Sequence, residues 1–472
     1  MQRRYKMKRN SLFLTIAVLC VILGCLLWVA TGLDQQPQEP SLQNPPSSDP
    51  STNPSTQTPT TQPTTPSATV PVTEPTEPPI IKEATATIGA TGDILMHDLV
   101  IASGYDKATG TFNYDNIFTH FSDYVSMVDY AVANLEVTLI QRPETDGLLG
   151  YNGYPNFNSP DEVAVALKDA GFDMLLTANN HSYDSRHNGF VRTQQVIQDL
   201  GLTHIGTRQN ESDANYVVVD VNGIKIGMIN YTYNTGIDAD GSISLNTIPL
   251  SVEDSRLTNS FNYNHLDDFY KKLSGEMEAM EEDGAEAIVL YIHWGDEYKT
   301  TPNSWQTQMA QQLCNMGIDV IVGNHAHVPQ PVELLTSETN ENQKTLCLYS
   351  TGNAVSNIYK TSTRPVHTED GMLFTFTFAK YSDGTVVVES TDVLPTWVWR
   401  YDDENGVRKF RIMTLDREIE DWKTHLGISD DILSKCRDSY DRTMAIVGDG
   451  LNAANTWFAD NQANVEAALG IR

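Results

Sequence analysis

The stretch VIVGNHAH at residues 320–327 constrains the fold of this chain more than any other. A run of Val and Ile is typical of a buried strand, and the Gly-Asn pair marks the turn that ends it. His325 and His327 follow that turn, and neutral imidazole is a common metal ligand. The motif alone is equally consistent with two loop histidines that bind nothing. A metal site is indicated only if other strands deliver matching ligands.

Strands and helices alternate along the rest of the chain. Apolar runs predict strands at 84–91, 130–136, 174–178, 287–292, 320–322 and 346–349, and helical spacing predicts helices at 118–128, 160–170, 190–200, 266–283 and 306–316. Asn222-Gly223 predicts a hairpin turn within 216–231, and 372–378 is expected to pair with 385–391. This alternation predicts α/β layers. Residues 234–264 are polar and are expected to form an irregular surface insertion that could serve as a lid.

Five predicted strands end in polar residues of the kinds that bind metals. These residues are Asp93, Glu136, Asn180 with His181, His293, and His325 with His327. In α/β sheets, ligands gather beyond the carboxyl ends of strands. Two carboxylates, an amide oxygen and three histidines suit one or two divalent metals with mixed ligation, such as Mn, Fe or Zn. Each residue alone could cap a helix or shape a turn, but one shared site accounts for all five strand ends.

The motifs around these residues carry a more specific signal. They are GDILM at 92–96, NLE at 134–136, NNHSYD at 179–184, HWGDEY at 293–298, GNHAHVPQPVE at 323–333 and YSTGN at 349–353. In this order they resemble the CapA family of capsule and poly-γ-glutamate synthesis proteins, a branch of the calcineurin-like metallophosphoesterase superfamily. The resemblance covers about residues 84–400. It implies a sandwich of two mixed sheets flanked by helices, with a dinuclear metal site at one edge.

The resemblance also implies a role for each candidate ligand. One metal would be held by Asp93 and His327. The second metal would be held by Asn180, His293 and His325. Glu136 would bridge the two metals, in place of the aspartate of the superfamily. Two adjacent metals can hold a hydroxide nucleophile and stabilise an oxyanion.

The remaining site residues have other implied roles. His181 would act as the general acid on the leaving group, oriented by a nearby carboxylate. Four further residues are expected either to contact the substrate or to hold the residues that do. They are Glu297, Tyr298, Glu333 and Asn353. The chain departs from the superfamily pattern at Leu95, where phosphoesterases place a histidine. His97 could substitute for that histidine or belong to a surface loop.

The N-terminal residues predict a membrane anchor and a stalk. Residues 1–10 are basic, and 11–33 are apolar and uncharged, which is long enough to cross a bilayer as a signal anchor with a cytoplasmic N-terminus. A cleaved signal peptide, or a lipoprotein cut before Cys25, is the competing interpretation. Residues 34–83 are rich in Pro, Thr and Ser and predict a disordered stalk. The domain at 84–400 is therefore expected outside the cytoplasm of a single-pass cell-membrane protein, followed by a mainly helical extension at 401–472 of unassigned role.

Composition restricts the partners. The formal net charge of −30 argues against a nucleic-acid partner, which requires basic patches. Beyond the membrane run the chain has Cys314, Cys347 and Cys436, without metal-binding spacing, so buried free thiols are expected.

Two classes of function follow. The first is an extracellular metal-dependent hydrolase or transferase that acts on an envelope polymer such as poly-γ-glutamate, or on a phosphorylated precursor. The alternative is a non-catalytic subunit that binds or guides an emerging polymer beside the synthase subunits of a membrane complex.

Overall fold

The computed structural model describes residues 80–141, 150–416, 423 and 427–468. The fold described below belongs to the compact unit Thr76–Arg472. The predicted basic tail, the membrane-spanning segment at 11–33 and the stalk up to residue 79 lie outside the described residues. Within the described ranges, no helix is both long and apolar enough to span a bilayer.

The first sheet is built around β1 (Lys82–Ile94), which begins two residues before the expected boundary at 84 because Lys82 already pairs with Tyr381. Its other strands are β4 (Tyr130–Leu135), β7 (Met174–Leu176), β8 (Thr203–Ile205), β19 (Asn353–Val355), β20 (Asp370–Tyr381), β21 (Val386–Asp402) and β22 (Arg408–Thr414). The order is β22-β21-β20-β1-β4-β7-β8, with β19 beside the end of β1. β1, β4, β7 and β8 run parallel, whereas β20 to β22 form an antiparallel meander.

The second sheet is also mixed. Its strands are β9 (Tyr216–Val221), β10 (Ile224–Tyr233), β14 (Ser260–Phe261), β15 (Ala287–His293), β16 (Val320–Asn324), β17 (Val332–Thr336) and β18 (Lys344–Leu348). The order is β14-β10-β15-β16-β18-β17, with β9 paired to β10 through the predicted Asn222-Gly223 turn. β10, β15, β16 and β18 run parallel. All carboxyl ends in this parallel set therefore point the same way.

The two sheets share one apolar core. Period-two alternation places Ile88 and Ala90 of β1 in the same buried cluster as Met228 of β10, Val289 of β15 and Val322 of β16. Side chains from two facing sheets interdigitate in this way in a sandwich. The expected sandwich of two mixed sheets is therefore confirmed.

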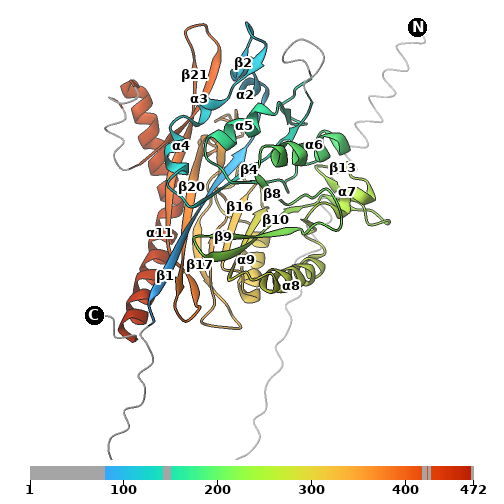
Figure 1. Ribbon diagram of the computed structural model, residues 1–472. Coiled ribbons are helices and arrows are strands. Elements are labelled where there is room, and N and C mark those ends of the chain that lie inside the picture. Colours follow the sequence, from blue (N-terminus) through green and yellow to red (C-terminus); the bar gives the residue numbers. More distant parts are fainter. Residues whose placement is uncertain (1–79, 142–149, 417–422, 424–426, 469–472) are drawn as a thin grey trace, which may run out of the picture. The chain divides into compact units, whose positions relative to one another are not determined.

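Helices cover the outer faces of both sheets (Figure 1). α5 (Glu162–Asp169) and α6 (Arg186–Asp199) pack on the first sheet, and α8 (Leu266–Glu282) and α9 (Ser304–Met316) pack on the second. The helix expected over 118–128 is divided into α3 (Asp115–Phe118) and α4 (Phe121–Val125). Shorter elements are α2 (Asp98–Ser103), the 3₁₀ helix η1 (Val366–Glu369), and the strand pairs β2 (Tyr105–Asp106) with β3 (Thr111–Phe112) and β5 (Thr138–Leu139) with β6 (Asn158–Ser159). A capping box begins α9, in which the Asn303 and Gln306 side chains each accept a hydrogen bond from the other residue's backbone N–H.

The C-terminal residues complete the sandwich. The boundary expected at residue 400 falls inside β21, and β22 extends the first sheet beyond it. α11 (Asp430–Ala468) is the expected helix and adds Val447 and Leu451 to the core between the sheets. In Figure 1 it lies along the strands of the sandwich. Arg442 of α11 donates two hydrogen bonds to the buried Asp370, so this helix is tied to β20. Cys314, Cys347 and Cys436 are buried free thiols, as expected.

The insertion at 234–264 is folded, so the expectation of irregular structure was wrong. It contains the three-stranded sheet β11 (Gly236–Ile237), β12 (Ile243–Leu245) and β13 (Ile248–Pro249), followed by α7 (Val252–Arg256) and β14. Its apolar side chains, Ile243 and Leu245 among them, pack against Tyr183 and Phe190 in a separate buried cluster. Burial of this small cluster overrides the polar composition of the segment.

Candidate metal centre

Parallel strands bring the predicted ligands to one edge of the sandwich. Asp93 of β1 pairs with Asn134 of β4, two residues before Glu136. His293 is the last residue of β15 and pairs with Asn324, the last residue of β16. The two sheets therefore deliver their polar strand ends to the same place, as sheet geometry predicts for ligands beyond carboxyl ends.

The turn after β16 has an unusual backbone. His325 and His327 have φ angles of 93° and 55°, in the left-handed region. Non-glycine residues adopt such angles at a cost, and they cluster at functional sites where neighbouring structure holds them. Gly323 allows β16 to approach the backbone of Tyr349, which follows β18. A Cβ at position 323 would lie 2.0 Å from the Tyr349 carbonyl oxygen. The two imidazoles of the HxH motif are therefore brought together by the left-handed backbone of this turn and not by the alternation of side chains along a strand.

The first group of potential ligands is Asp93, Glu136 and His327, all buried, whose donor atoms lie within 4.8 Å of one another. His327 Nδ1 is 2.9 Å from Asp93 Oδ2, and His327 Nε2 is 3.9 Å from Glu136 Oε1. Asn134 Nδ2 donates to Asp93 Oδ1 at 2.7 Å. Burial alone would lower the pKa of His327, but the hydrogen bond and charge of Asp93 raise it overall.

The second group is Glu136, His293 and His325. His293 Nε2 lies 3.5 Å from Glu136 Oε1 and 3.1 Å from His325 Nδ1. Asn180 Oδ1 lies 2.8 Å from the same His293 nitrogen. Glu136 therefore belongs to both groups, and the Asn180 oxygen completes the second.

These residues fit one or two divalent cations. Glu136 Oε1 is buried and has no hydrogen-bond partner among the described residues. Burial, followed by the charge of Asp93, raises the pKa of Glu136, so its anionic form lacks compensation from the protein alone. Burial and neighbouring imidazoles lower the pKa of His293 and of His325, which keeps them in the neutral form that binds metals. A cation at each group would compensate the carboxylates and use the converging nitrogens.

His181 lies beside these groups and is almost fully buried. Its Nδ1 is 2.7 Å from Asp184 Oδ2, and its Nε2 is 4.0 Å from Glu136 Oε1. Asp184 Oδ2 also accepts a hydrogen bond from the Phe157 backbone N–H, and the Phe157 ring meets the imidazole edge to face at 4.7 Å. Asp184 supplies the carboxylate expected beside His181. It orients the ring so that Nε2 faces the centre.

Three of the four predicted pocket residues lie near the centre. Asn353 is fully buried, its Oδ1 is 3.1 Å from His327 Nδ1, and its Nδ2 donates to the His327 carbonyl, so it holds that histidine. The Tyr298 ring lies 6.1 Å from the His327 ring. Glu297 is exposed, and its charge contributes to the raised pKa of Tyr298, after burial.

Glu333 is not brought to the centre. It is exposed on β17 and accepts a hydrogen bond from Tyr349 Oη at 2.9 Å. The register places Glu333 level with Cys347 and Ile321. Ile321 precedes His325 by four residues, so Glu333 lies about 13 Å from His325 along the strand direction. Antiparallel pairing of β17 carries this residue away from the edge that its sequence position suggested.

Leu95 and His97 occupy different environments. The Leu95 side chain is buried in the apolar cluster of the first sheet. His97 Nδ1 accepts a hydrogen bond from the Asn357 N–H at 3.2 Å, and its ring meets Phe157 edge to face. Burial, followed by the nearby His327, lowers the pKa of His97 to about 4. His97 is not a member of either ligand group, so the position of the superfamily histidine is not filled from this turn.

Sequence reasoning missed Asn246 and Arg364. Asn246 Nδ2 lies 3.3 Å from His181 Nδ1, and the Arg364 guanidinium lies 5.7 Å from the centre of the Tyr298 ring. An Asn between two short apolar runs signals a tight turn, which could have drawn attention to Asn246. No local signal pointed to Arg364, because its approach depends on the loop between β19 and η1.

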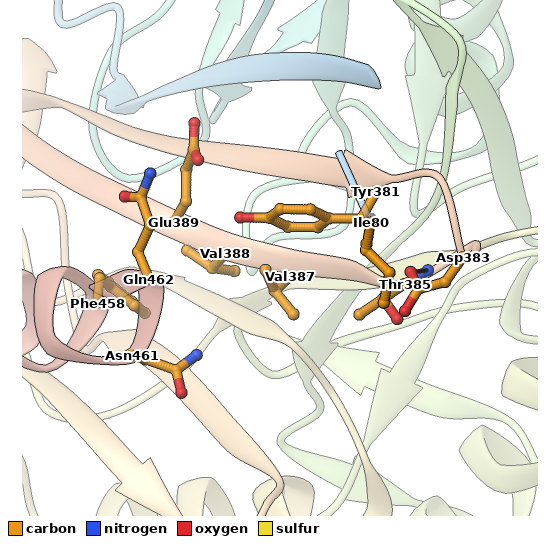
Figure 2. A pocket seen from close by; sticks show the side chains of 10 residues that line it. All are labelled: Ile80, Tyr381, Asp383, Thr385, Val387, Val388, Glu389, Phe458, Asn461 and Gln462. Atoms are coloured by element: carbon orange, nitrogen blue, oxygen red, sulfur yellow. Dashed lines mark hydrogen bonds between the residues drawn. The ribbon is translucent and has the colours of Figure 1, made fainter. Parts of the chain in front are cut away.

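The structure also contains a cavity with a largely apolar lining (Figure 2). It has a volume of about 270 Å³ and is lined by apolar side chains that include Ile80, Tyr381, Val388 and Phe458. Ile80 precedes the first residue of β1, whereas Asp93 lies near the last. The cavity is therefore at the opposite end of β1 and is not part of the candidate centre.

The segment that carries the centre is similar to known bacterial proteins. The family described as "Bacterial capsule synthesis protein PGA_cap" matches residues 87–358, which include every member of the two ligand groups. The "Capsule biosynthesis protein CapA" of Bacillus anthracis is 28% identical over 278 residues, 57% of this chain and 59% of that protein. The "PGA biosynthesis protein CapA" of Bacillus subtilis (strain 168) is 27% identical over 307 residues, 64% of this chain and 70% of that protein. The match thus spans less than two thirds of the first relative.

Among solved structures, the crystal structure of TT1561 of Thermus thermophilus aligns with 61% of this chain and 94% of its own, with a TM-score of 0.30 and 8% identity. Similarity at this level supports no argument about fold or function.

Proposed function

The chain belongs to the bacterial capsule synthesis protein family PGA_cap, and from this premise we propose that it is a metal-dependent hydrolase of capsule or poly-γ-glutamate biosynthesis. Its substrate would be an envelope polymer or a phosphorylated precursor. The observation that carries the proposal is the placement of Glu136 in both ligand groups, with His181 Nε2 4.0 Å from its free oxygen. Shared carboxylate ligation and an adjacent proton donor are the components of two-metal hydrolysis.

Each residue has a defined task in this mechanism. Asp93, Glu136 and His327 would hold one cation, and Glu136, His293, His325 and Asn180 the other. Bound cations would supply Lewis acidity toward a substrate oxyanion. His181 would donate the Nε2 proton to the leaving group, and Asp184 would hold the ring through Nδ1. Water would be the co-reactant that attacks the substrate, and the near-complete burial of these side chains strengthens the electrostatic interactions among them.

A cationic side chain at the rim favours an anionic substrate. Arg364 is exposed, and its guanidinium lies 5.7 Å from the centre of the Tyr298 ring. Arg is well suited to carboxylate and phosphate groups because its planar fork donates paired hydrogen bonds. The net charge of −30 opposes long-range attraction of a polyanion, so recognition would depend on this local contact and on the cations.

Metal analysis and a hydrolysis screen of the purified full chain test the proposal. We expect bound Mn, Fe or Zn in the wild type, turnover of a phosphodiester or a γ-glutamyl polymer, and metal loss in His325→Ala. His181→Ala should retain metal while turnover falls about 10²–10⁴-fold, the usual contribution of a general acid. His265→Ala is a matched control, because that imidazole is exposed and lies outside the centre. Full metal content in His325→Ala would refute the ligand assignment.

One observation favours a non-catalytic alternative, in which the domain binds or guides a polymer beside membrane synthase subunits. Leu95 removes a polar group that the superfamily places at this site, and its side chain points into the core. Metal binding without any turnover, together with unchanged polymer length in cells carrying His181→Ala, would support this alternative.

We also propose that residues 11–33 anchor the protein in the cell membrane with the folded domain outside. The uncharged apolar run and its basic flank support this orientation. Protease added to intact cells should remove the folded domain if it is outside. Protection of the domain until the cells are lysed would contradict the orientation.

A further inference from the structure

The folded insertion places Asn246 against the candidate centre. Asn246 and Thr247 form the two-residue turn between β12 and β13. Asn246 Oδ1 accepts a hydrogen bond from Asn180 Nδ2 at 3.1 Å. Asn246 Nδ2 lies 3.3 Å from Nδ1 and 3.5 Å from Nε2 of His181. One partly buried side chain thus contacts both the amide assigned as a ligand and the imidazole assigned as the acid.

The backbone of this turn is strained at the residue that does not contact the centre. The φ angles of Asn246 and Thr247 are 46° and 63°. Two positive φ angles are typical of a type I′ hairpin turn, which favours Asn first and Gly second. Thr247 is β-branched and exposed, so it adopts this conformation at a cost. Thr247 therefore carries the backbone strain and Asn246 makes the contact with the site. Substituting each residue separately distinguishes the two effects.

The rest of the insertion is fixed to the loop that carries His181. Asp254 of α7 is 1% exposed and accepts a hydrogen bond from Tyr183 Oη at 2.6 Å. The second oxygen of Asp254 lies 2.9 Å from His187 Nδ1. Together with the apolar cluster that contains Tyr183, these contacts make the insertion a fixed wall of the site. Asn246 is therefore held in place from both sides of its hairpin.

We propose that Asn246 is a positioning residue that fixes the amide of Asn180. The Asn180 amide can turn over, and only one orientation presents its oxygen, now 2.8 Å from His293 Nε2, to a cation. In the flipped orientation the Asn180 oxygen would face Asn246 Oδ1, and an NH₂ group would face the cation. Partners of this kind orient metal ligands and affect affinity. The inference rests on the proposed function, since it assumes a cation at the second group.

Calorimetric titration of the metal-free full chain with Mn²⁺ tests the inference without any substrate. Asn246→Ala and Asn246→Gly should weaken binding about 10–100-fold, the usual effect of losing such a partner. Asn246→Gly is included because glycine accepts the positive φ angle and keeps the hairpin. Asn246→Asp retains an acceptor for Asn180 Nδ2, so its affinity should stay within about threefold of the wild type or rise.

Thr247→Gly is the matched control. This substitution removes the backbone strain at position 247 and leaves the side chains of the centre unchanged. Metal affinity should therefore be unchanged, and thermal stability should not fall. Wild-type affinity in both Asn246→Ala and Asn246→Gly overturns the inference and leaves the proposed function intact. The same loss in Thr247→Gly as in Asn246→Ala also overturns it, because the hairpin rather than the amide would then matter. A wild-type chain that takes up no Mn²⁺, and no Zn²⁺ in a parallel titration, overturns the proposed function and the inference with it.

Discussion

The two halves of the candidate centre share Glu136 and differ in nearly everything else. One half adds Asp93 and His327, and the other adds His293, His325 and the Asn180 oxygen. The first half is anionic, and the nearby Leu95 is buried in the apolar core. Its histidine, His327, is buried, but the adjacent Asp93 raises the pKa of that imidazole. The second half is nitrogen-rich, and burial lowers the pKa of both its histidines.

This difference implies unequal affinities. Neutral imidazoles bind borderline metals such as Zn and Fe without first losing a proton, whereas carboxylates favour harder ions such as Mn. We therefore expect the nitrogen-rich half to hold its cation more tightly and the anionic half to exchange its cation more readily. Four measurements test this difference between the two halves.

The largest effect is expected from Glu136→Gln, since this carboxylate belongs to both halves. The substitution removes an anionic ligand from each cation while keeping the volume of the side chain. Total metal content, measured by mass spectrometry of the purified chain, should fall by more than half, and turnover should fall at least about 10³-fold if both cations act in one step. Retention of one full equivalent of metal would show that the carboxylate serves a single half.

Separate removal of one histidine from each half tests the asymmetry itself. His325→Ala should abolish the tighter titration phase or weaken it by more than the about 10–100-fold expected for a partner outside the ligand set, and should leave the weaker phase measurable. His327→Ala should act on the weaker phase. Titration calorimetry with Zn²⁺ and then Mn²⁺ resolves the two phases. Equal effects of the two substitutions on both phases would contradict independent halves.

A third measurement separates acid effects on the centre from those on the fold. Burial raises the pKa of Asp319, outside both halves, from 3.8 to about 7. The folded chain therefore binds more protons than the unfolded chain between about pH 4 and 7, so this residue makes stability fall as pH rises through that range. Asp319→Asn should leave stability near pH 4 unchanged and increase it by about 1–3 kcal/mol at pH 8. Its amide can still accept the hydrogen bond that Asp319 receives from the Ile288 N–H.

Urea unfolding of the metal-free chain at pH 4 and pH 8 measures this effect. An Asp319→Asn chain whose stability relative to the wild type is the same at both pH values would exclude the raised pKa.

The smallest effect is expected from Arg364, which lies at the rim of the anionic half. Arg364→Ala should raise the KM for an anionic substrate about 3–10-fold, with little change in kcat or metal content, because an exposed charged contact contributes modestly. Arg364→Lys should recover part of the loss. A large fall in kcat with unchanged KM would place this residue in the chemical step instead.

Local patterns were sufficient for much of this site. Apolar runs followed by polar residues pointed to Asp93, Glu136, Asn180, His293 and the two histidines after β16 as candidates, because parallel strands all end at one edge. The same logic failed for Glu333, which follows the HxH motif by only six residues but lies on an antiparallel strand that runs back. Strand direction depends on pairing partners distant in the sequence, so no local signal could settle it.

The sequence by itself determined the alternation of strands and helices and the chemical set of candidate ligands, since these depend on side-chain period and on residue type. The family, and the sandwich of mixed sheets that it implies, followed from the resemblance of six motifs. Only the tertiary structure decided which candidate ligands lie together in each group, that Asp184 orients His181, and that α11 and β22 complete the domain. It also converted a polar segment without a periodic pattern into the hairpin that presents Asn246. These features depend on long-range packing, in which a small buried cluster and a few hydrogen bonds outweigh local composition.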